Sequence, residues 1–430
     1  MKYNCLFDMR GANMNSYRVV GGNKIEGSIK LQGAKNSALP ILAATLLIKN
    51  KSVIHNCPDL SDVDAALKIL VKLGCVCVRD ENTVIVDSTD AANYEIGKDL
   101  SGEMRSSIVF LGAIIARMGK AVISSPGGCE LGPRPIDMHL TALRQLGVNI
   151  REENGVLNCN CHNGLVGSEI YLRFPSVGAT ENIMIASCLA RGTTVIRGAA
   201  KEPEISDLAD FLNRAGAHIK GAGSSTVIIE GVPSLHSAEH TVMSDRIVAA
   251  TFLSAAAGTG GNIEITDCPA YNMHTILKFF EKIGCDMKVK DNSVYMKCSG
   301  GLKASGVTVT DVYPAFPTDA GPLIVAMFSK LPDENSLFET IFENRFRYVP
   351  ELNKLGADIH QNGKKVTSMG PKKLYGETVT CTDLRGGAAL VVAALNAEGE
   401  SIINDIYHIE RGYQSFAPTL KLLGANIEEL

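Results

Sequence analysis

One pattern of apolar and polar positions recurs six times along the 430-residue chain. In each copy an apolar stripe at helical spacing is followed by a small residue with glycine, and then by a short strand-like run. The copies read LKILVKLGCVCV, LTALRQLGVNI, LADFLNRAGAHI, LKFFEKIGCDM, PELNKLGADI and LKLLGANI. Their glycines lie 73, 69, 68, 72 and 68 residues apart, at Gly74, Gly147, Gly216, Gly284, Gly356 and Gly424. So even a spacing indicates an internal repeat.

Each repeat holds more than this phrase. A helix of small residues, then a glycine and a strand, precedes it, as in CLARGTTVIRG and LNAEGESIINDI, and a hairpin such as GCDMKVKDNSVYM follows it. We therefore predict the order β-α-β-α-β-β with mixed strands for each repeat. The glycine after each amphipathic helix fits a helix C-terminal position that needs positive φ.

Three repeats per globule give two domains. The sixth copy ends at Leu430 without its returning strands, and YRVVGGNKIEGSIKLQG near the N-terminus matches the missing hairpin return. We expect an α/β fold with two globular domains, each of three repeated βαβαββ units (an inside-out α/β barrel), hinged by two crossings. The predicted domains are 35–243, and 14–34 together with 244–430, after an N-terminal extension over 1–13. A solenoid scaffold is the alternative, but solenoid repeats usually span only about 20–50 residues.

Composition narrows the class of protein. Hydrophobic residues make up 45% of the chain and the net charge is only −4, which is typical of a globular protein and argues against nucleic-acid binding. The longest uncharged apolar stretch, 38–48, is too short to span a membrane, and the N-terminus lacks the apolar core of a signal peptide. We expect a cytoplasmic location with the twelve cysteines as free thiols. Without any CxxC, no metal site is expected.

Polar residues recur at two positions of the repeat. The start of the small-residue helix, where free backbone N–H groups attract anions, carries Lys35, Arg105, Ser176–Gly178, Asp245 with Arg246, Asp319 and Arg385. The loop after the next strand carries Cys129 with Arg134, Glu202 with Glu204, Arg345, and Arg411. No GxxxxGK[ST] occurs, and no GxGxxG opens a helix. The pattern favours a substrate with several negative charges, held without a P-loop or a Rossmann turn.

Cys129 lies in SPGGCELGPRP, a stretch that must be a loop because glycine and proline break regular structure. Three interpretations compete: a core thiol placed in a turn, a metal ligand, and a reactive thiol. Arg134 and the neighbouring anion site favour the reactive thiol, since cations tune a thiol pKa. His139 is a weak candidate for a catalytic partner, and a surface or hydrogen-bonded core histidine is the alternative.

The motifs LQGAKN, PGGCELGPRPIDMH, SVGAT, EPEI, AFPTD, FENRF, TDLR and YHIERGY carry a family resemblance. From Tyr17 to Leu430 the chain resembles the UDP-N-acetylglucosamine 1-carboxyvinyltransferase family of enolpyruvyl transferases. The resemblance implies transfer of the enolpyruvyl group of phosphoenolpyruvate to the 3′-hydroxyl of UDP-N-acetylglucosamine with release of phosphate, the first committed step of peptidoglycan synthesis. It implies no cofactor, two small-molecule substrates, and no nucleic-acid or membrane partner.

The resemblance also implies roles for single residues. Cys129 would be the general acid for phosphoenolpyruvate on a mobile lid, and Asp319 would take the proton from the sugar hydroxyl. The groups that contact phosphoenolpyruvate, Lys35 and Arg411 also being catalytic, would be Lys35, Asn36, Arg134, Arg345, Arg385 and Arg411. The nucleotide side would use Arg105, Arg134, Pro135, Ile136, Asp137, Met138, Ser176, Val177, Gly178, Asp319 and Ile341.

The chain departs from the family pattern in two places. It has DRIVAATF where the family has DRIEAGTF, so Val248 and Ala250 replace a glutamate and a glycine. It also has Ala320, Gly321 and Pro322 directly after the FPTD motif. These changes leave open a regulatory paralogue that binds the UDP-sugar without turnover. The shikimate-pathway enolpyruvyl transferase is a further alternative, which PGGC and YHIERGY disfavour.

Overall fold

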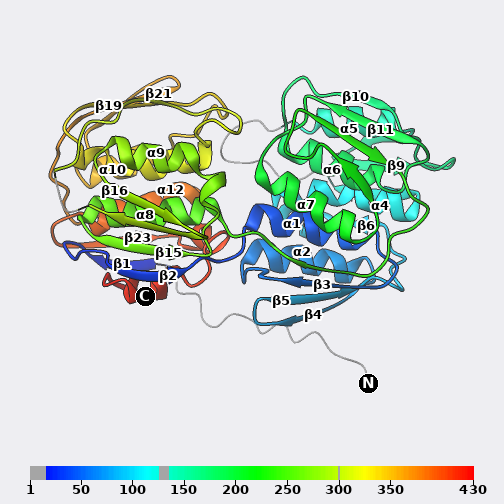
Figure 1. Ribbon diagram of the computed structural model, residues 1–430, viewed down its shortest axis with the longest axis horizontal. Coiled ribbons are helices and arrows are strands. Elements are labelled where there is room, and N and C mark those ends of the chain that lie inside the picture. The colour runs from blue at the N-terminus through cyan, green and yellow to red at the C-terminus, as the bar shows by residue number, and fades with distance from the viewer. Residues whose placement is uncertain (1–15, 125–134, 299–300) are drawn as a thin grey trace. The chain divides into compact units, whose positions relative to one another are not determined.

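The computed structural model describes residues 16–124, 135–298 and 301–430. Contacts divide these residues into two compact units (Figure 1). The described part of unit 1 is 33–124 and 135–243, and that of unit 2 is 16–32, 244–298 and 301–430.

All six sheets share one topology. Each has four strands: the first is parallel to the second, the second is antiparallel to the third, and the third is antiparallel to the fourth. No strand pairing joins one sheet to another among the described residues. The predicted βαβαββ repeat is therefore confirmed, as six separate sheets rather than a continuous hydrogen-bonded barrel.

Unit 1 contains three of these sheets. Its strands alternate buried and exposed side chains, so that one face of each sheet packs on helices. The sheets are β14 (Ala238–Thr241), β3 (Lys51–His55), β5 (Thr83–Asp87), β4 (Val76–Asp80); β6 (Glu95–Ile96), β7 (Lys120–Ser124), β9 (Val156–Asn160), β8 (Asn149–Glu153); and β10 (Glu169–Tyr171), β11 (Thr193–Arg197), β13 (Thr226–Glu230), β12 (His218–Lys220).

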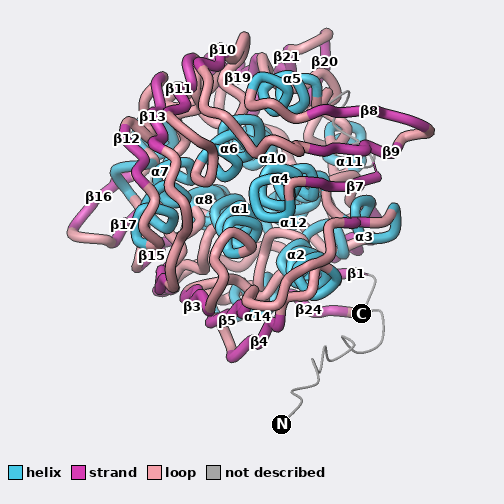
Figure 2. The backbone as a smooth tube through the Cα atoms, turned by 90° about the vertical axis from the view of Figure 1, so that its right-hand side faces the viewer, coloured by secondary structure: helices cyan, strands magenta, loops and turns pink. Residues whose placement is uncertain are grey.

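Three helices form the centre of unit 1: α1 (Lys35–Thr45), α4 (Phe110–Met118) and α6 (Val177–Ser187). Small residues such as Ala and Gly let them pack directly on one another. The strands lie around them (Figure 2). The remaining helices of this unit are α2 (Ser61–Lys72), α3 (Lys98–Glu103), η1 (Arg105–Val109), α5 (Asp137–Gln145) and α7 (Pro203–Arg214).

Unit 2 repeats this plan. Its sheets are β2 (Gly27–Lys30), β15 (Asn262–Thr266), β17 (Ser293–Lys297), β16 (Asp286–Lys290); β18 (Gly306–Val309), β19 (Asp333–Phe338), β21 (Lys365–Gly370), β20 (Ile359–Asn362); and β22 (Thr378–Thr380), β23 (Glu400–Asn404), β1 (Ser16–Val20), β24 (Asn426–Glu429). The helices packed at its centre are α8 (Arg246–Thr259), α10 (Gly321–Met327) and α12 (Leu384–Leu395). The others are η2 (Ala270–Asn272), α9 (His274–Lys282), η3 (Thr318–Ala320), η4 (Phe328–Lys330), α11 (Val349–Lys354), α13 (Tyr407–Glu410) and α14 (Phe416–Leu422).

The two N-terminal strands close different sheets. β1 lies between β23 and β24 and completes the sixth repeat. β2 instead pairs in parallel with β15 of the fourth repeat, although its sequence suggested the same hairpin return. The chain leaves β2 for α1 of unit 1, and it leaves β14 of unit 1 for α8 of unit 2. The two connecting segments are hydrogen-bonded, from Ala34 N–H to the Met243 carbonyl at 2.7 Å and from Asp245 N–H to the Gln32 carbonyl at 2.9 Å.

The glycines that revealed the repeat all have the predicted conformation. Their φ angles lie between 95° and 100°, which is left-handed backbone that only glycine adopts without strain. Each ends a helix and turns the chain into the following strand. The residues are Gly74, Gly147, Gly216, Gly284, Gly356 and Gly424.

One prediction about the cysteines is wrong. Cys285 and Cys298 form a disulfide across the hairpin of β16 and β17. Because Asp286 pairs with Lys297, these two cysteines lie directly opposite one another, with their Cα atoms 4.8 Å apart. Seven other described cysteines are free and buried: Cys57, Cys75, Cys159, Cys161, Cys188, Cys268 and Cys381.

Candidate active site

The polar positions that repeat in the sequence lie where the central helices begin. Lys35 is the first residue of α1, Ser176 caps α6, and Asp245 caps α8 through the N–H groups of Ile247 and Val248. Arg105 begins η1, which continues into α4. The prediction that these residues occupy helix N-termini is confirmed.

In unit 2 the start of η3 and the start of α12 are joined by side chains. The Arg345 guanidinium Nη2 donates to the Asp319 carboxylate at 2.9 Å and to the Thr318 carbonyl at 3.0 Å. Arg385 Nε lies 3.6 Å from the other carboxylate oxygen of Asp319. Both arginines are almost completely buried, at 1% and 2% exposed, whereas the Asp319 side chain is 30% exposed. An accessible carboxylate is thus paired with two buried cations.

These two arginines have hydrogen-bond donors to spare. Arg345 Nε, Arg385 Nε and Arg385 Nη1 are buried and have no hydrogen-bond partner among the described residues. An unsatisfied buried donor is costly, more so when it is charged. The arrangement therefore suits an anionic ligand that would accept these N–H groups.

Aromatic rings hold the guanidinium groups in place. The Arg345 guanidinium lies 5.6 Å from the centre of the Phe342 ring, and that of Arg385 lies 5.3 Å from the Tyr413 ring. The Tyr413 hydroxyl is hydrogen-bonded to Thr251 of α8 at 2.8 Å, and burial raises the pKa of Tyr413. The packing fixes the direction of both arginines before any ligand binds.

Two further predicted residues of unit 2 lie on loops. Ile341 follows β19, is half-buried, and its N–H donates to Glu339 at 2.7 Å. Arg411 follows α13 and is half-buried. The next residue, Gly412, accepts a hydrogen bond from the Gln32 side chain at 3.3 Å, and Gln414 N–H donates to Gln32 at 2.8 Å. Gln32 thereby ties the loop after Arg411 to the segment that leads to α1.

In unit 1 the predicted cation Lys35 forms an ion pair. Its Nζ lies 3.1 Å from Asp62 Oδ2, and the two side chains are 12% and 6% exposed. Asn36, the next residue, is exposed. Asp62 lies in the first turn of α2 and was not singled out in the sequence.

His139 is a core residue rather than a catalytic partner. It is buried in α5, and its Nδ1 is hydrogen-bonded to Asn182 of α6 at 3.0 Å. Burial, together with the Arg105 guanidinium, lowers the pKa of His139 to about 4, while Asp137 acts in the opposite direction. A Cβ on Gly178 would come within 3.2 Å of the His139 ring, so this glycine allows α6 to approach α5.

The loop before α5 is only partly described. Asp137 begins α5 and pairs with Arg173 at 2.5 Å, and the Arg173 guanidinium lowers the pKa of Asp137. Pro135 is exposed, and Ile136 and Met138 are half-buried. Cys129 and Arg134 lie outside the described residues.

Buried acids accompany the EPEI motif. Glu181 of α6 is buried, and burial, then Glu204 and Glu202, raises its pKa to about 8. No signal in the sequence marked Glu181, because it lies within the small-residue helix. Among the described residues no group of His, Cys, Asp and Glu side chains is placed to hold a metal ion.

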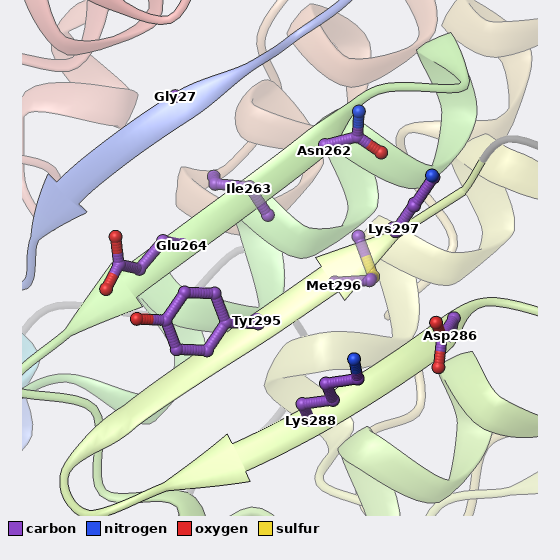
Figure 3. Close-up of a pocket in the computed structure, with 9 residues that line it drawn as sticks. All are labelled: Gly27, Asn262, Ile263, Glu264, Asp286, Lys288, Tyr295, Met296 and Lys297. Atoms are coloured by element: carbon purple, nitrogen blue, oxygen red, sulfur yellow. The ribbon is translucent and has the colours of Figure 1, made fainter.

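A shallow groove lies elsewhere, on the sheet of β2, β15, β17 and β16 (Figure 3). Side chains of the exposed face, among them Glu264, Lys288 and Tyr295, line it. None of the predicted site residues takes part.

The residues that differ from the family pattern are buried in unit 2. Val248 and Ala250 lie in the first two turns of α8, each 2% exposed. Gly321 and Pro322 begin α10, and only Ala320 separates them from Asp319. A Cβ on Gly321 would come within 3.0 Å of Leu337, so the glycine permits close packing there.

Known proteins are similar to nearly the whole chain. The family described as EPSP synthase (3-phosphoshikimate 1-carboxyvinyltransferase) matches residues 19–420. The chain is 47% identical over 414 residues to a protein of Caldanaerobacter subterraneus named UDP-N-acetylglucosamine 1-carboxyvinyltransferase 2, covering 96% of this chain and 99% of that one. It is 46% identical to UDP-N-acetylglucosamine 1-carboxyvinyltransferase 1 of Symbiobacterium thermophilum, covering 96% and 95%.

The chain belongs to the enolpyruvyl transferase family. Among solved structures, the enolpyruvyl transferase NikO from Streptomyces tendae is similar with a TM-score of 0.87 at 25% identity, covering 96% of this chain and 98% of that one. EPSP synthase from Acinetobacter baumannii shares the fold, with a TM-score of 0.77 at 17% identity over 96% and 99%. The predicted family, fold class and enzyme class are confirmed. In the described part of this member, no helix has the length and apolar character that crossing a membrane requires.

Proposed function

We propose that this enzyme transfers the enolpyruvyl group of phosphoenolpyruvate to the 3′-hydroxyl of UDP-N-acetylglucosamine and releases phosphate, a step of peptidoglycan synthesis. The observation that carries this proposal is the pair of buried arginines with unused donors beside Asp319. The names of the relatives at 46% and 47% identity support the choice of substrates. A cytoplasmic location stays a prediction.

Asp319 is the proposed base for the sugar hydroxyl. A general base must be reachable by its substrate and held in one orientation. The Asp319 side chain is partly exposed, and Arg345 holds one of its oxygens. The unused N–H groups of Arg345 and Arg385 would donate to the carboxylate end of phosphoenolpyruvate, for which the planar guanidinium is well suited.

The phosphate of phosphoenolpyruvate is assigned to Lys35, Arg134 and Arg411, and Asn36 would orient the reacting centre. Cys129 would protonate the methylene carbon. Preorganised cations stabilise the charge that develops as phosphate leaves. Of this set, Lys35 is held by Asp62 before any substrate binds.

The nucleotide is assigned to side chains that surround the ends of α5 and α6 and to the loop after β19. Ser176 caps α6, and Asp137 starts α5. The proposed contacts are Arg105, Arg134, Pro135, Ile136, Asp137, Met138, Ser176, Val177, Gly178, Asp319 and Ile341.

A phosphate-release assay tests the proposal. The purified full chain is incubated with both substrates, with each substrate alone, and with shikimate 3-phosphate in place of the UDP-sugar. We expect phosphate only with phosphoenolpyruvate and the UDP-sugar together. Tight UDP-sugar binding without phosphate release would instead support a regulatory paralogue, and release with shikimate 3-phosphate would support the shikimate-pathway reaction.

A further inference from the structure

Glu339 is a fully buried carboxyl group next to the candidate site. It directly follows β19 and is 0% exposed. Its Oε1 accepts the N–H groups of Ile341 at 2.7 Å and Phe342 at 3.0 Å, and its Oε2 accepts the Thr318 hydroxyl at 2.9 Å. One side chain thus bonds both the loop 339–348 and the start of η3.

Site residues lie on both sides of this link. Thr318 directly precedes Asp319, the proposed base. On the other side, Ile341 is a proposed nucleotide contact, and the Phe342 ring lies against the Arg345 guanidinium. Arg345 in turn donates to the Thr318 carbonyl and to Asp319. Glu339 and Arg345 therefore hold the same short segment from the same loop.

Four of the other repeats turn differently at this position. The residue directly after the equivalent strand has positive φ in four of them, which turns the chain tightly toward the next helix. Glu339 does not have positive φ. The four residues, with φ between 51° and 73°, are Asn56, Gly198, Asp267 and Asp405.

This repeat also has a longer loop than the first repeat. α11 begins at Val349 after β19 ends at Phe338, whereas α2 begins at Ser61 after β3 ends at His55. A longer loop needs its own anchors if it is to hold a side chain still. The Glu339 carboxyl, which satisfies two N–H groups of the loop, supplies such an anchor.

We propose that Glu339 is a positioning residue for the reaction: through the Thr318 hydroxyl it sets where Asp319 stands relative to Ile341 and Arg345. This inference rests on the proposed function. A base displaced by about 1 Å can cost about 10²-fold in rate. The effect should therefore fall on kcat more than on KM for the UDP-sugar.

Thr318→Val is the sharpest test, because it removes one hydroxyl and keeps the shape of the side chain. Glu339 then still accepts the two loop N–H groups, so folding should be retained. We expect kcat to fall about tenfold with KM for the UDP-sugar within about twofold. Thr318→Ser, which restores the hydroxyl, should recover kcat to within about twofold of the original chain.

Thr340→Val is the matched control. The Thr340 hydroxyl donates to the Thr310 carbonyl at 2.6 Å, so this variant also removes one hydroxyl hydrogen bond from the same loop. It does not touch the Thr318–Asp319 segment through that bond. We expect a comparable loss of melting temperature in both variants, with kcat of Thr340→Val within about twofold of the original chain.

Glu339→Ala removes all three bonds and should lower kcat by about 10²-fold. Circular dichroism and the melting temperature will show whether it folds. Equal kcat for Thr318→Val and the original chain, or equal losses in Thr318→Val and Thr340→Val, would overturn the positioning role while the proposed function stands. Absence of phosphate release from the original chain would overturn both.

Discussion

The two units place their predicted cations in contrasting surroundings. In unit 1, Lys35 at the start of α1 is paired with Asp62, a carboxylate supplied by the neighbouring helix α2. In unit 2 the equivalent helix start carries the acid itself, Asp319, and the cations Arg345 and Arg385 come from a loop and from another central helix. The arginines keep unused donors.

Equivalent positions of one repeated fold have thus acquired opposite charges. The backbone plan is the same, since in both units the residue lies where a central helix begins. What differs is which side chain stands at the helix start and which neighbour neutralises it. The repeated fold places a residue at the start of each central helix, and the amino acid at that position determines whether the side chain is an acid or a cation.

The first prediction is that Cys129 reacts faster than the buried thiols of the chain. Burial raises the pKa of Cys57, Cys188, Cys268 and Cys381 to about 12. At neutral pH the thiolate fraction of such a thiol is about 10³-fold below that of an ordinary cysteine, and alkylation follows the thiolate. With UDP-sugar bound, we expect Cys129 to react about 10³-fold faster than these four thiols.

Labelling with an epoxide phosphonate that mimics phosphoenolpyruvate, followed by mass spectrometry of the peptides, measures this difference. Cys129→Asp should escape the label, and it can stay active because a carboxylic acid also donates a proton. Comparable labelling of Cys57 or Cys268 would contradict the prediction.

The second prediction concerns the substitution of Asp319, the proposed base in unit 2. Asp319→Asn keeps the shape of the side chain but takes away the proposed base, so turnover should fall by about 10²-fold or more. UDP-sugar binding should survive, as isothermal titration calorimetry can show. An unchanged rate would mean that the proton is taken by another group, and the contrast between the two units would lose its catalytic meaning.

Much of this architecture could be predicted from the sequence. The six glycines lie one per repeat at a helix end, so their spacing predicts the number of repeats, and the helix and hairpin patterns around them predict the βαβαββ order. The motif residues at helix starts were predictable too, because helix periodicity locates Lys35 and Asp319 within a turn. The sequence pattern was sufficient for features that depend only on neighbouring residues, such as the start and the end of a helix.

The rest depends on contacts between distant segments. Asp62 forms an ion pair with Lys35, which lies 27 residues earlier in the sequence. Nothing in the first turn of α2 distinguishes Asp62 from Asp64. The Cys285–Cys298 disulfide follows from the register of one hairpin, which the sequence predicts only as a hairpin. The strand β2 was assigned to the wrong repeat because both candidate sheets accept an alternating strand.

The third prediction concerns the neutral histidine of unit 1. The pKa of His139 is lowered from 6.5 to about 4, chiefly by burial, so the unfolded chain takes up a proton at a higher pH than the folded chain. Stability is then fully present above about pH 6.5 and is lost as the pH falls toward 4, by about 2 to 3 kcal/mol from this residue.

Denaturant unfolding between pH 4 and pH 7.5 measures the slope. His139→Gln can keep the hydrogen bond to Asn182 and cannot titrate, so the loss of stability with acid should become smaller. His218→Gln, at an exposed histidine of the same unit, is the control and should leave the slope unchanged. An identical slope in His139→Gln would show that His139 is not the residue responsible.

The last prediction is that Arg345 and Arg385 of unit 2 have different roles in the reaction. Arg345 donates directly to Asp319, whereas Arg385 is only 3.6 Å from it and keeps Nε and Nη1 unused. Lysine retains the positive charge but cannot present the planar fork that binds a carboxylate by two bonds. Arg385→Lys should therefore raise KM for phosphoenolpyruvate about tenfold with a smaller change in kcat. Arg345→Lys should also lower kcat, since it releases the base.

Arg197→Lys, at an exposed arginine paired with Glu169, serves as the control for the exchange itself. Steady-state kinetics with each substrate varied in turn will distinguish the two effects. If both variants changed KM and kcat in the same proportion, the two guanidinium groups would act as one charge, and the division of work between holding the base and binding the substrate would be wrong.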